Sequence, residues 1–126
     1  MSASGVLAYL AAITVIGWGL MHVIPTRAVA DSFGEISLDN RRILVMEWIA
    51  EGITHIFIGV LVIIVTAIEG SGSSASQLVY RLAAAVLILL AALTSVTGAR
   101  TPVIWFRVCP FVLGGAAILL LVASAV

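Results

Sequence analysis

Charged side chains are scarce in this 126-residue sequence, where Asp, Glu, Lys and Arg together make up 10% and lysine does not occur at all. Hydrophobic residues make up 63% and the mean hydropathy is +1.27. Such a composition excludes an ordinary soluble domain. We therefore predict an integral protein of the cell membrane, with one domain over residues 1–126.

Cysteine and recognisable catalytic motifs are scarce as well. The single cysteine, Cys109, excludes an internal disulfide and a CxxC redox pair. There is no nucleophile elbow and no phosphate-binding loop, and beyond Arg41 and Arg42 there is no basic patch that would bind nucleic acid. The N-terminus also lacks the positive charge and cleavage site of a signal peptide, so the first apolar segment is expected to remain in the protein.

The sequence contains four long apolar runs instead, at about residues 5–24, 41–68, 77–96 and 103–123. A helix of about 20 residues crosses roughly 30 Å of hydrocarbon. Long runs of Leu, Ala, Ile and Val without alternation are typical of membrane helices rather than barrel strands. Because the links are mostly short, we predict an all-α fold, an antiparallel four-helix transmembrane bundle whose termini lie on the same side.

Basic residues are distributed unevenly along this predicted bundle. Only Arg81 lies toward the end that holds the second connection. The arginines at the opposite end are Arg27, Arg41, Arg42, Arg100 and Arg107. The positive-inside bias places this arginine-rich end in the cytoplasm and both termini outside.

Small residues recur on two of the predicted helices. Gly52 and Gly59 share the second helix, and residues 114–117 of the fourth are Gly and Ala. Such faces let membrane helices approach closely. They are expected to pack within the chain or against a second copy of it.

Three ionisable residues follow one another at four-residue spacing in the second run: Glu47, Glu51 and His55. Each step turns only about 40° around a helix, so the three share one face. The rise per residue places Glu47 at the interface, Glu51 roughly 3 Å inside and His55 roughly 9 Å inside the hydrocarbon. Charged groups are costly at such depths, so this face is expected to look into the bundle.

Other polar and aromatic side chains reach the same level of the bundle. His22 lies near the end of the first helix at about the depth of Glu51, and Arg107 falls between Glu51 and His55. We therefore expect His22, Glu51, His55 and Arg107 to line one cavity near the cytoplasmic face. The full candidate ligand-binding set is His22, Glu47, Glu51, His55, Arg107, Trp18 and Trp48.

Several chemistries are compatible with this set. His22, Glu51 and His55 are suitable ligands for zinc, iron or manganese. The same residues would serve a protein that relays protons or transports a small polar ligand, with Arg107 as counter-charge. A membrane enzyme acting on a lipid or quinone head group, with Glu51 and His55 as acid and base, is the alternative from a different class. The remaining alternative is an accessory subunit with a structural ion-pair network.

Two further features concern architecture. The first predicted helix ends in MHVIP, and the four-helix layout resembles the DoxX-like group of small bacterial membrane proteins. The resemblance is one of helix number and implies a quinone-linked redox function as an expectation. The 14-residue connection from Arg27 to Asn40 would form either a lid over the cluster or a solvated linker.

Overall fold

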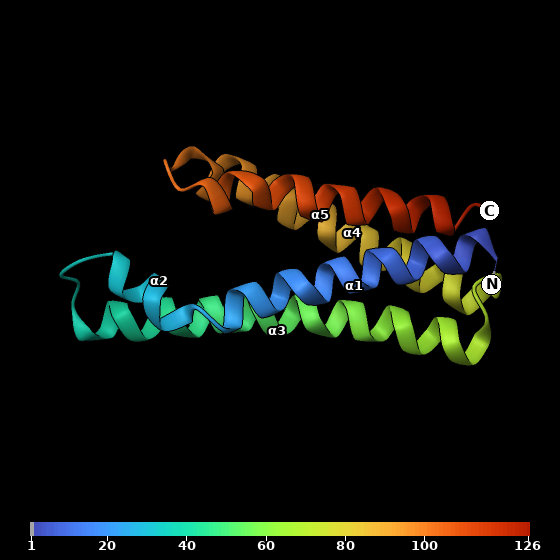
Figure 1. Cartoon of the computed structure of the whole chain (residues 1–126), viewed down its shortest axis with the longest axis horizontal. Coiled ribbons are helices and arrows are strands. Elements are labelled where there is room, and N and C mark those ends of the chain that lie inside the picture. The colour runs from blue at the N-terminus through green and yellow to red at the C-terminus, as the bar shows by residue number, and fades with distance from the viewer. Residues whose placement is uncertain (1) are drawn as a thin grey trace.

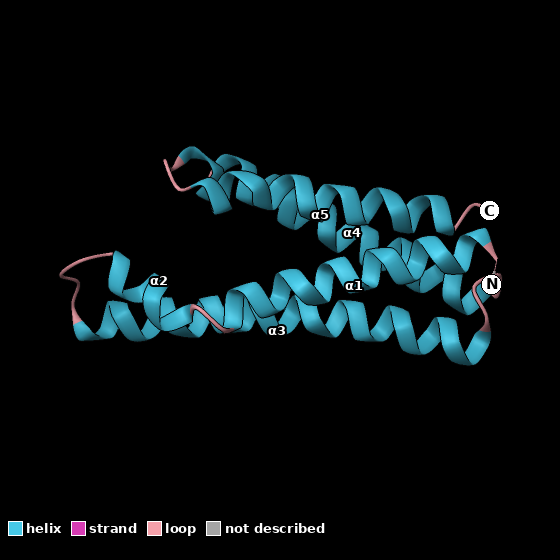
Figure 2. Ribbon diagram, viewed as in Figure 1, coloured by secondary structure: helices cyan, strands magenta, loops and turns pink. Residues whose placement is uncertain are grey.

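The computed structural model describes residues 2–126, which fold into helices joined by short loops, with no strand in that range (Figure 2). Four of the helices are long and apolar enough to cross a membrane. The all-helical prediction is therefore confirmed. In chain order the elements are α1 (Ala3–Val23), α2 (Thr26–Ser32), α3 (Leu38–Glu69), α4 (Ser74–Val96), the 3-10 turn η1 (Gly98–Arg100) and α5 (Ile104–Ala123).

Serine residues begin three of the long helices. The hydroxyl of Ser2 accepts a hydrogen bond from the Gly5 amide, and Ser37 and Ser73 cap α3 and α4 in the same way. Each cap satisfies an amide that has no partner inside its own helix. Helix α3 ends at Gly70, whose φ of 77° lies in the left-handed region that favours glycine.

The long helices associate as two pairs, α1 with α3 and α4 with α5 (Figure 1). Helix α1 also contacts α5, and α3 contacts α4, so the two pairs close into one bundle. Both chain ends lie at the same end of this bundle, where the Ser4 hydroxyl donates to the Ala123 carbonyl oxygen at 2.6 Å. At the other end the two pairs diverge in Figure 1, and α2 lies beside α3.

The buried core is made mostly of alanine and branched aliphatic residues from all four long helices. One buried polar contact crosses it, between the hydroxyls of Thr66 on α3 and Tyr80 on α4 at 2.6 Å. Alanine lets helices approach closely, and the aliphatic side chains fill the remaining space. The core contains Ala8, Ala11, Ala12, Val15, Ile58, Val62, Ala83, Ala84, Leu87, Leu113, Ala116, Ala117, Leu120 and Ala123.

Glycines set the distance between α1 and α3. A Cβ atom added at Gly59 would lie 2.6 Å from the Ala12 carbonyl oxygen, and one added at Gly52 would lie 2.9 Å from the Gly19 carbonyl oxygen. Both distances are shorter than a van der Waals contact, so only glycine fits. Gly114 differs from the sequence-based expectation, because a Cβ there would meet nothing within 4 Å.

Gly59→Ala is expected to lower the melting temperature of the detergent-solubilised protein, because α1 and α3 must move apart to accept the methyl group. Overpacking of this kind costs about 1–3 kcal/mol of stability. Alanine has a higher helix propensity than glycine, which is worth roughly 1 kcal/mol, so the net effect is destabilising. Gly114→Ala is the matched control, since it offers the same helix propensity in open space and should leave the melting temperature unchanged or raise it. Equal melting temperatures for the two variants would contradict this account of the α1–α3 contact.

Candidate functional site

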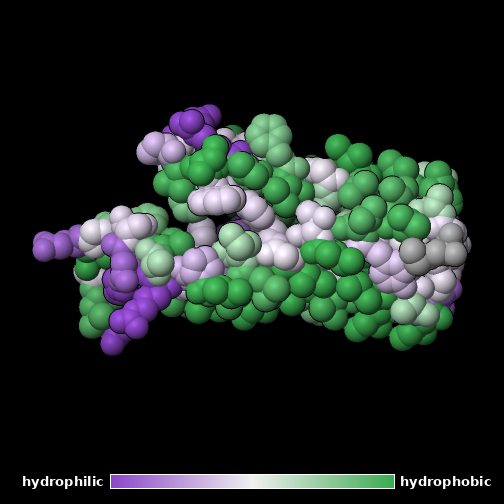
Figure 3. All heavy atoms as spheres, viewed as in Figure 1, coloured by the Kyte–Doolittle hydropathy of each residue, from purple (hydrophilic) through white to green (hydrophobic). Residues whose placement is uncertain are grey.

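A cavity of ≈ 540 Å³ lies between the two helix pairs, at the end of the bundle away from the termini. Residues of α1, α2, α3, α4, η1 and α5 all contribute to it, and most of its wall is apolar. Figure 3 shows a hollow in this half of the molecule, bordered by residues of intermediate hydropathy with hydrophobic residues beyond them. The aromatic rings that line the cavity are those of Trp18, Phe33, Trp48, Trp105 and Phe106.

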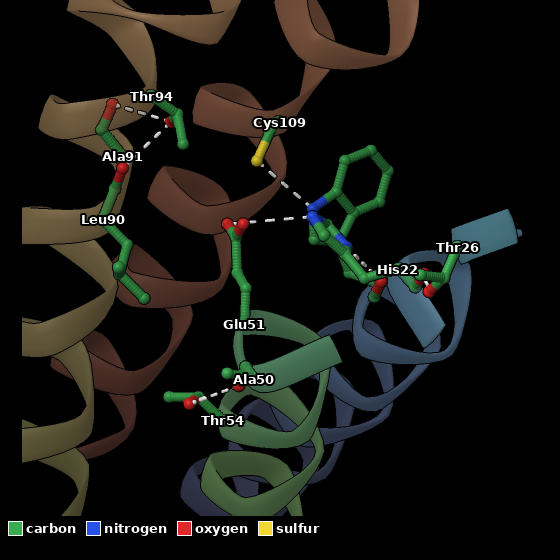
Figure 4. A network of polar contacts seen from close by, with 10 residues as sticks. His22, Thr26, Ala50, Glu51, Thr54, Leu90, Ala91, Thr94 and Cys109 are labelled. Atoms are coloured by element: carbon green, nitrogen blue, oxygen red, sulfur yellow. Dashed lines mark hydrogen bonds and ion pairs between the residues drawn. The ribbon is translucent and has the colours of Figure 1, made fainter. Parts of the chain in front are cut away.

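His22 and Glu51 form the ionisable part of the cavity wall. The His22 Nε2 atom lies 3.7 Å from a Glu51 carboxylate oxygen, and Figure 4 shows the two side chains directed toward each other from α1 and α3. His22 is buried, whereas 28% of the Glu51 side chain is exposed. The separation is longer than a normal hydrogen bond, so the two groups lie near each other without a direct hydrogen bond.

A backbone hydrogen bond sets the orientation of the His22 ring. Its Nδ1 atom lies 2.9 Å from the Trp18 carbonyl oxygen, which can only accept a hydrogen bond. Nδ1 therefore carries hydrogen, and in the neutral ring Nε2 presents its lone pair toward Glu51. Histidines that bind metals are commonly held by such a bond through the other ring nitrogen.

His55 lies one helical turn beyond Glu51 and has no exposed surface. Its ring packs against that of His22 with a centroid separation of 5.4 Å. Neither ring nitrogen of His55 has a hydrogen-bond partner among the described residues. Because buried polar atoms are nearly always hydrogen-bonded, the His55 ring is an unusual feature of this part of the bundle.

One donor atom from each of His22, Glu51 and His55 lies within 4.8 Å of the other two. Tetrahedral coordination by atoms at about 2.0–2.1 Å from a zinc ion places the donors roughly 3.4 Å apart. The His22–Glu51 separation of 3.7 Å is already close to this value. Small side-chain adjustments would bring the three donors around one ion.

Two tryptophans surround the His22 ring. Trp48 lies 4.7 Å from it between ring centroids, and the Trp18 ring is placed edge-on at 5.9 Å. The Trp18 indole N–H donates to the Cys109 sulfur at 3.3 Å, whereas the buried Trp48 N–H has no partner among the described residues. The site thus contains a second unpartnered polar group, which is a donor.

Arg107 lies outside this cavity, contrary to the sequence-based expectation. Its side chain is exposed, its Nε atom donates to the Thr101 carbonyl oxygen at 2.9 Å, and it borders a separate groove between α4 and α5. A helix turns about 100° per residue, so the side chains of Arg107 and Cys109 point to nearly opposite sides of α5. Because Cys109 faces the cavity, Arg107 faces away from it.

Glu47 also lies outside the cavity, where it is exposed to solvent. Glu47 shares a face of α3 with Glu51. Helix α1 packs on this face only as far as Gly52, because α1 ends at Val23, and Glu47 lies one turn beyond that contact. No long helix therefore covers Glu47. Of the candidate set, the structure brings together His22, Glu51, His55, Trp18 and Trp48.

Several lining residues were not among the sequence-based candidates. Trp105 and Phe106 come from the first turn of α5, and Phe33 follows α2. Trp105 lies at the same level of the bundle as Trp18 and Trp48, which is the signal that could have identified it in the sequence. Nothing in the sequence distinguished Phe106 from an ordinary membrane-facing residue.

The connection between α1 and α3 covers one side of the cavity. Val29 and Ser32 of α2, together with Phe33, line the wall, and α2 contacts α3. The side chains of Asp31 and Arg41 form an ion pair that ties α2 to the start of α3. This hydrogen bond with Arg41 holds the pKa of Asp31 below its usual value.

No protein-family model matches this chain, and neither a curated protein nor a solved structure is similar enough to match it. The resemblance to DoxX-like proteins therefore remains a hypothesis.

Asp31→Asn is expected to loosen α2, as measured by faster hydrogen–deuterium exchange over residues 26–32. Since the folded pKa of Asp31 is lowered, the ion pair stabilises docking of α2 at any pH above the ordinary aspartate value of about 3.9 and is lost as the pH falls through the lower folded value. The parent protein should therefore lose protection of α2 in acid, and the variant should be insensitive to pH in that range.

Asp39→Asn is the matched control for this experiment. Asp39 pairs with Arg42 of the same helix at 3.6 Å, so its loss leaves α2 attached. Similar exchange over α2 in the two variants would show that the Asp31–Arg41 pair does not hold it.

Proposed function

We propose that this protein is a multi-pass membrane protein that binds a divalent transition-metal ion through His22, Glu51 and His55. The observation that carries the proposal is the fully buried His55 ring, whose unpartnered nitrogens lie beside the His22–Glu51 pair. An imidazole buried without a hydrogen bond is costly, and a metal ion would satisfy it. Two imidazoles and one carboxylate are suitable ligands for zinc, with iron and manganese as alternatives.

The membrane location is supported by the length and hydropathy of α1, α3, α4 and α5. These helices expose many large apolar side chains, which lipid would cover. The arginine-rich end of the bundle then faces the cytoplasm, with both termini outside, according to the positive-inside bias. The metal site lies at the cytoplasmic end of the hydrocarbon region.

These three residues would supply an incomplete coordination sphere to a bound ion. His22 and Glu51 line the cavity, whereas His55 lies behind them. Three protein ligands with one open position are typical of zinc sites that react with or bind a further molecule. Because His22 and Glu51 line the cavity, a further ligand would reach a bound ion from the cavity and would also contact its aromatic wall.

A second candidate function is a membrane enzyme that acts on a lipid or quinone head group. The aromatic lining of the cavity favours it, because flat or apolar groups pack well between such rings. In that case the acid and base are His22 and Glu51, since His55 does not line the cavity. Tight binding of a metal by these residues favours the first proposal over the second.

Purified protein equilibrated with Zn²⁺ should retain one ion per chain after gel filtration, as measured by elemental mass spectrometry. His55→Ala and Glu51→Gln each remove a ligand and should weaken Zn²⁺ binding at least about tenfold. Glu47→Gln removes a carboxylate one turn from Glu51 on the same helix, but outside the cluster, and should bind Zn²⁺ like the parent. Equal binding by all three variants would exclude the proposed metal site.

Glu51→Gln should also have a metal-free melting temperature equal to or above that of the parent. A ligand-binding carboxylate is placed for binding rather than for folding, and its removal relieves the burial of charge. A carboxylate in a structural ion pair behaves differently, since breaking a buried pair costs about 3–5 kcal/mol. A clear loss of stability with retained Zn²⁺ binding would assign Glu51 to the structural network of an accessory subunit.

Cysteine labelling of intact cells tests the orientation. In a Cys109→Ser background, Ser2→Cys and Val126→Cys should react with an impermeant maleimide from outside. Glu35→Cys, in the exposed loop between α2 and α3, should react only after the cells are permeabilised. Labelling of residues 2 and 126 from opposite sides would contradict the antiparallel arrangement, and a full reversal would contradict the positive-inside assignment.

A further inference from the structure

The cavity beside the proposed metal site is much larger than a coordinating water molecule requires. A water molecule occupies about 30 Å³ in the liquid, whereas the cavity measures ≈ 540 Å³. Its ionisable groups lie on one part of the wall, at His22 and Glu51, and most of the remaining wall is apolar or aromatic. A ligand that fits this distribution has a polar head and a hydrocarbon body.

The rim of the cavity is apolar and exposed. Met21, Phe33 and Trp105 line the cavity and are 51%, 50% and 60% exposed, respectively. Figure 3 shows hydrophobic residues above and below the hollow, beyond the paler residues that border it. An apolar rim on a protein that lies in a bilayer offers a path for a molecule from the lipid phase rather than for a hydrophilic solute.

The net charge of the proposed metal site indicates the charge of the ligand's head group. A divalent ion bound by one carboxylate and two neutral imidazoles leaves a net charge of +1 in an apolar site, which an anionic ligand would neutralise. The unpartnered N–H of Trp48, next to His22, adds a donor for an oxygen acceptor.

We propose that the cavity binds a single-chain amphiphile with a carboxylate head. One carboxylate oxygen takes the open position on the metal, and the hydrocarbon chain packs against the aromatic wall and leaves across the rim. This inference rests on the proposed metal-binding function, because the metal supplies the positive charge that the carboxylate neutralises.

The test uses Co²⁺-loaded protein in nanodiscs of zwitterionic phosphatidylcholine, because the visible absorption of Co²⁺ reports its coordination. Decanoate is the probe, acetate supplies the same head group without a chain, and decyltrimethylammonium supplies the chain with the opposite charge. Decanoate should change the Co²⁺ spectrum at a concentration at least 100-fold below that of acetate, since each buried methylene contributes roughly fourfold in affinity. Decyltrimethylammonium should leave the spectrum unchanged.

Decanoate also partitions into the bilayer, so a pair of variants isolates the contribution of the cavity. Trp105→Ala removes an aromatic ring from the rim and should weaken the decanoate effect about tenfold with the Co²⁺ content unchanged. Phe111→Ala removes a ring that is 79% exposed on α5 outside this cavity, and it should behave like the parent.

The Co²⁺ content is measured first, which separates failure of the two proposals. Protein that binds no Co²⁺ would overturn both the metal site and the amphiphile inference. Bound Co²⁺ with no preference for decanoate over acetate would overturn the amphiphile inference alone. Equal weakening by Trp105→Ala and Phe111→Ala, or an equal response to decyltrimethylammonium, would do the same.

Discussion

The close approach of α1 to α3 is the contact on which the candidate site depends. Gly52 follows Glu51 directly, and a Cβ at Gly52 would lie 3.1 Å from the Cβ of His22. A larger residue at Gly52 would force α1 to shift, and His22 lies on the part of α1 that would move. The glycines therefore do more than pack two helices, since they bring an imidazole of one helix between two ionisable groups of the other.

The two halves of the bundle are built differently. In one half, small core residues from both helix pairs fill the interior, and the Thr66–Tyr80 hydrogen bond links α3 to α4. In the other half the pairs diverge, and large aromatic side chains line the space between them without filling it. A bundle that is closely packed at one end can hold a cavity at the other because the closed half fixes the relative position of the pairs.

Sequence reasoning placed His22, Glu51 and His55 together because depth and four-residue spacing are both readable from the chain. It misplaced Arg107, since depth along a helix does not determine the direction in which a side chain points. The direction of Arg107 became clear only from the structure, where Cys109 lies on the side of α5 that lines the cavity and Arg107 lies on the other side. The seven-residue helix α2 was not foreseen as a helix, because a segment this short depends on contacts with the rest of the fold, here with α3.

The three residues of the proposed metal site come from α1 and α3 alone, while α4, η1 and α5 supply much of the opposite cavity wall. The proposed metal ligands and much of the cavity wall therefore belong to different parts of the chain. Sequence changes in the second helix pair can reshape the space offered to a bound molecule while the donor atoms stay in place. If the proposed metal site is correct, such a division would let the α1–α3 pair keep its ligands over evolutionary time while the second pair adapts to different bound molecules.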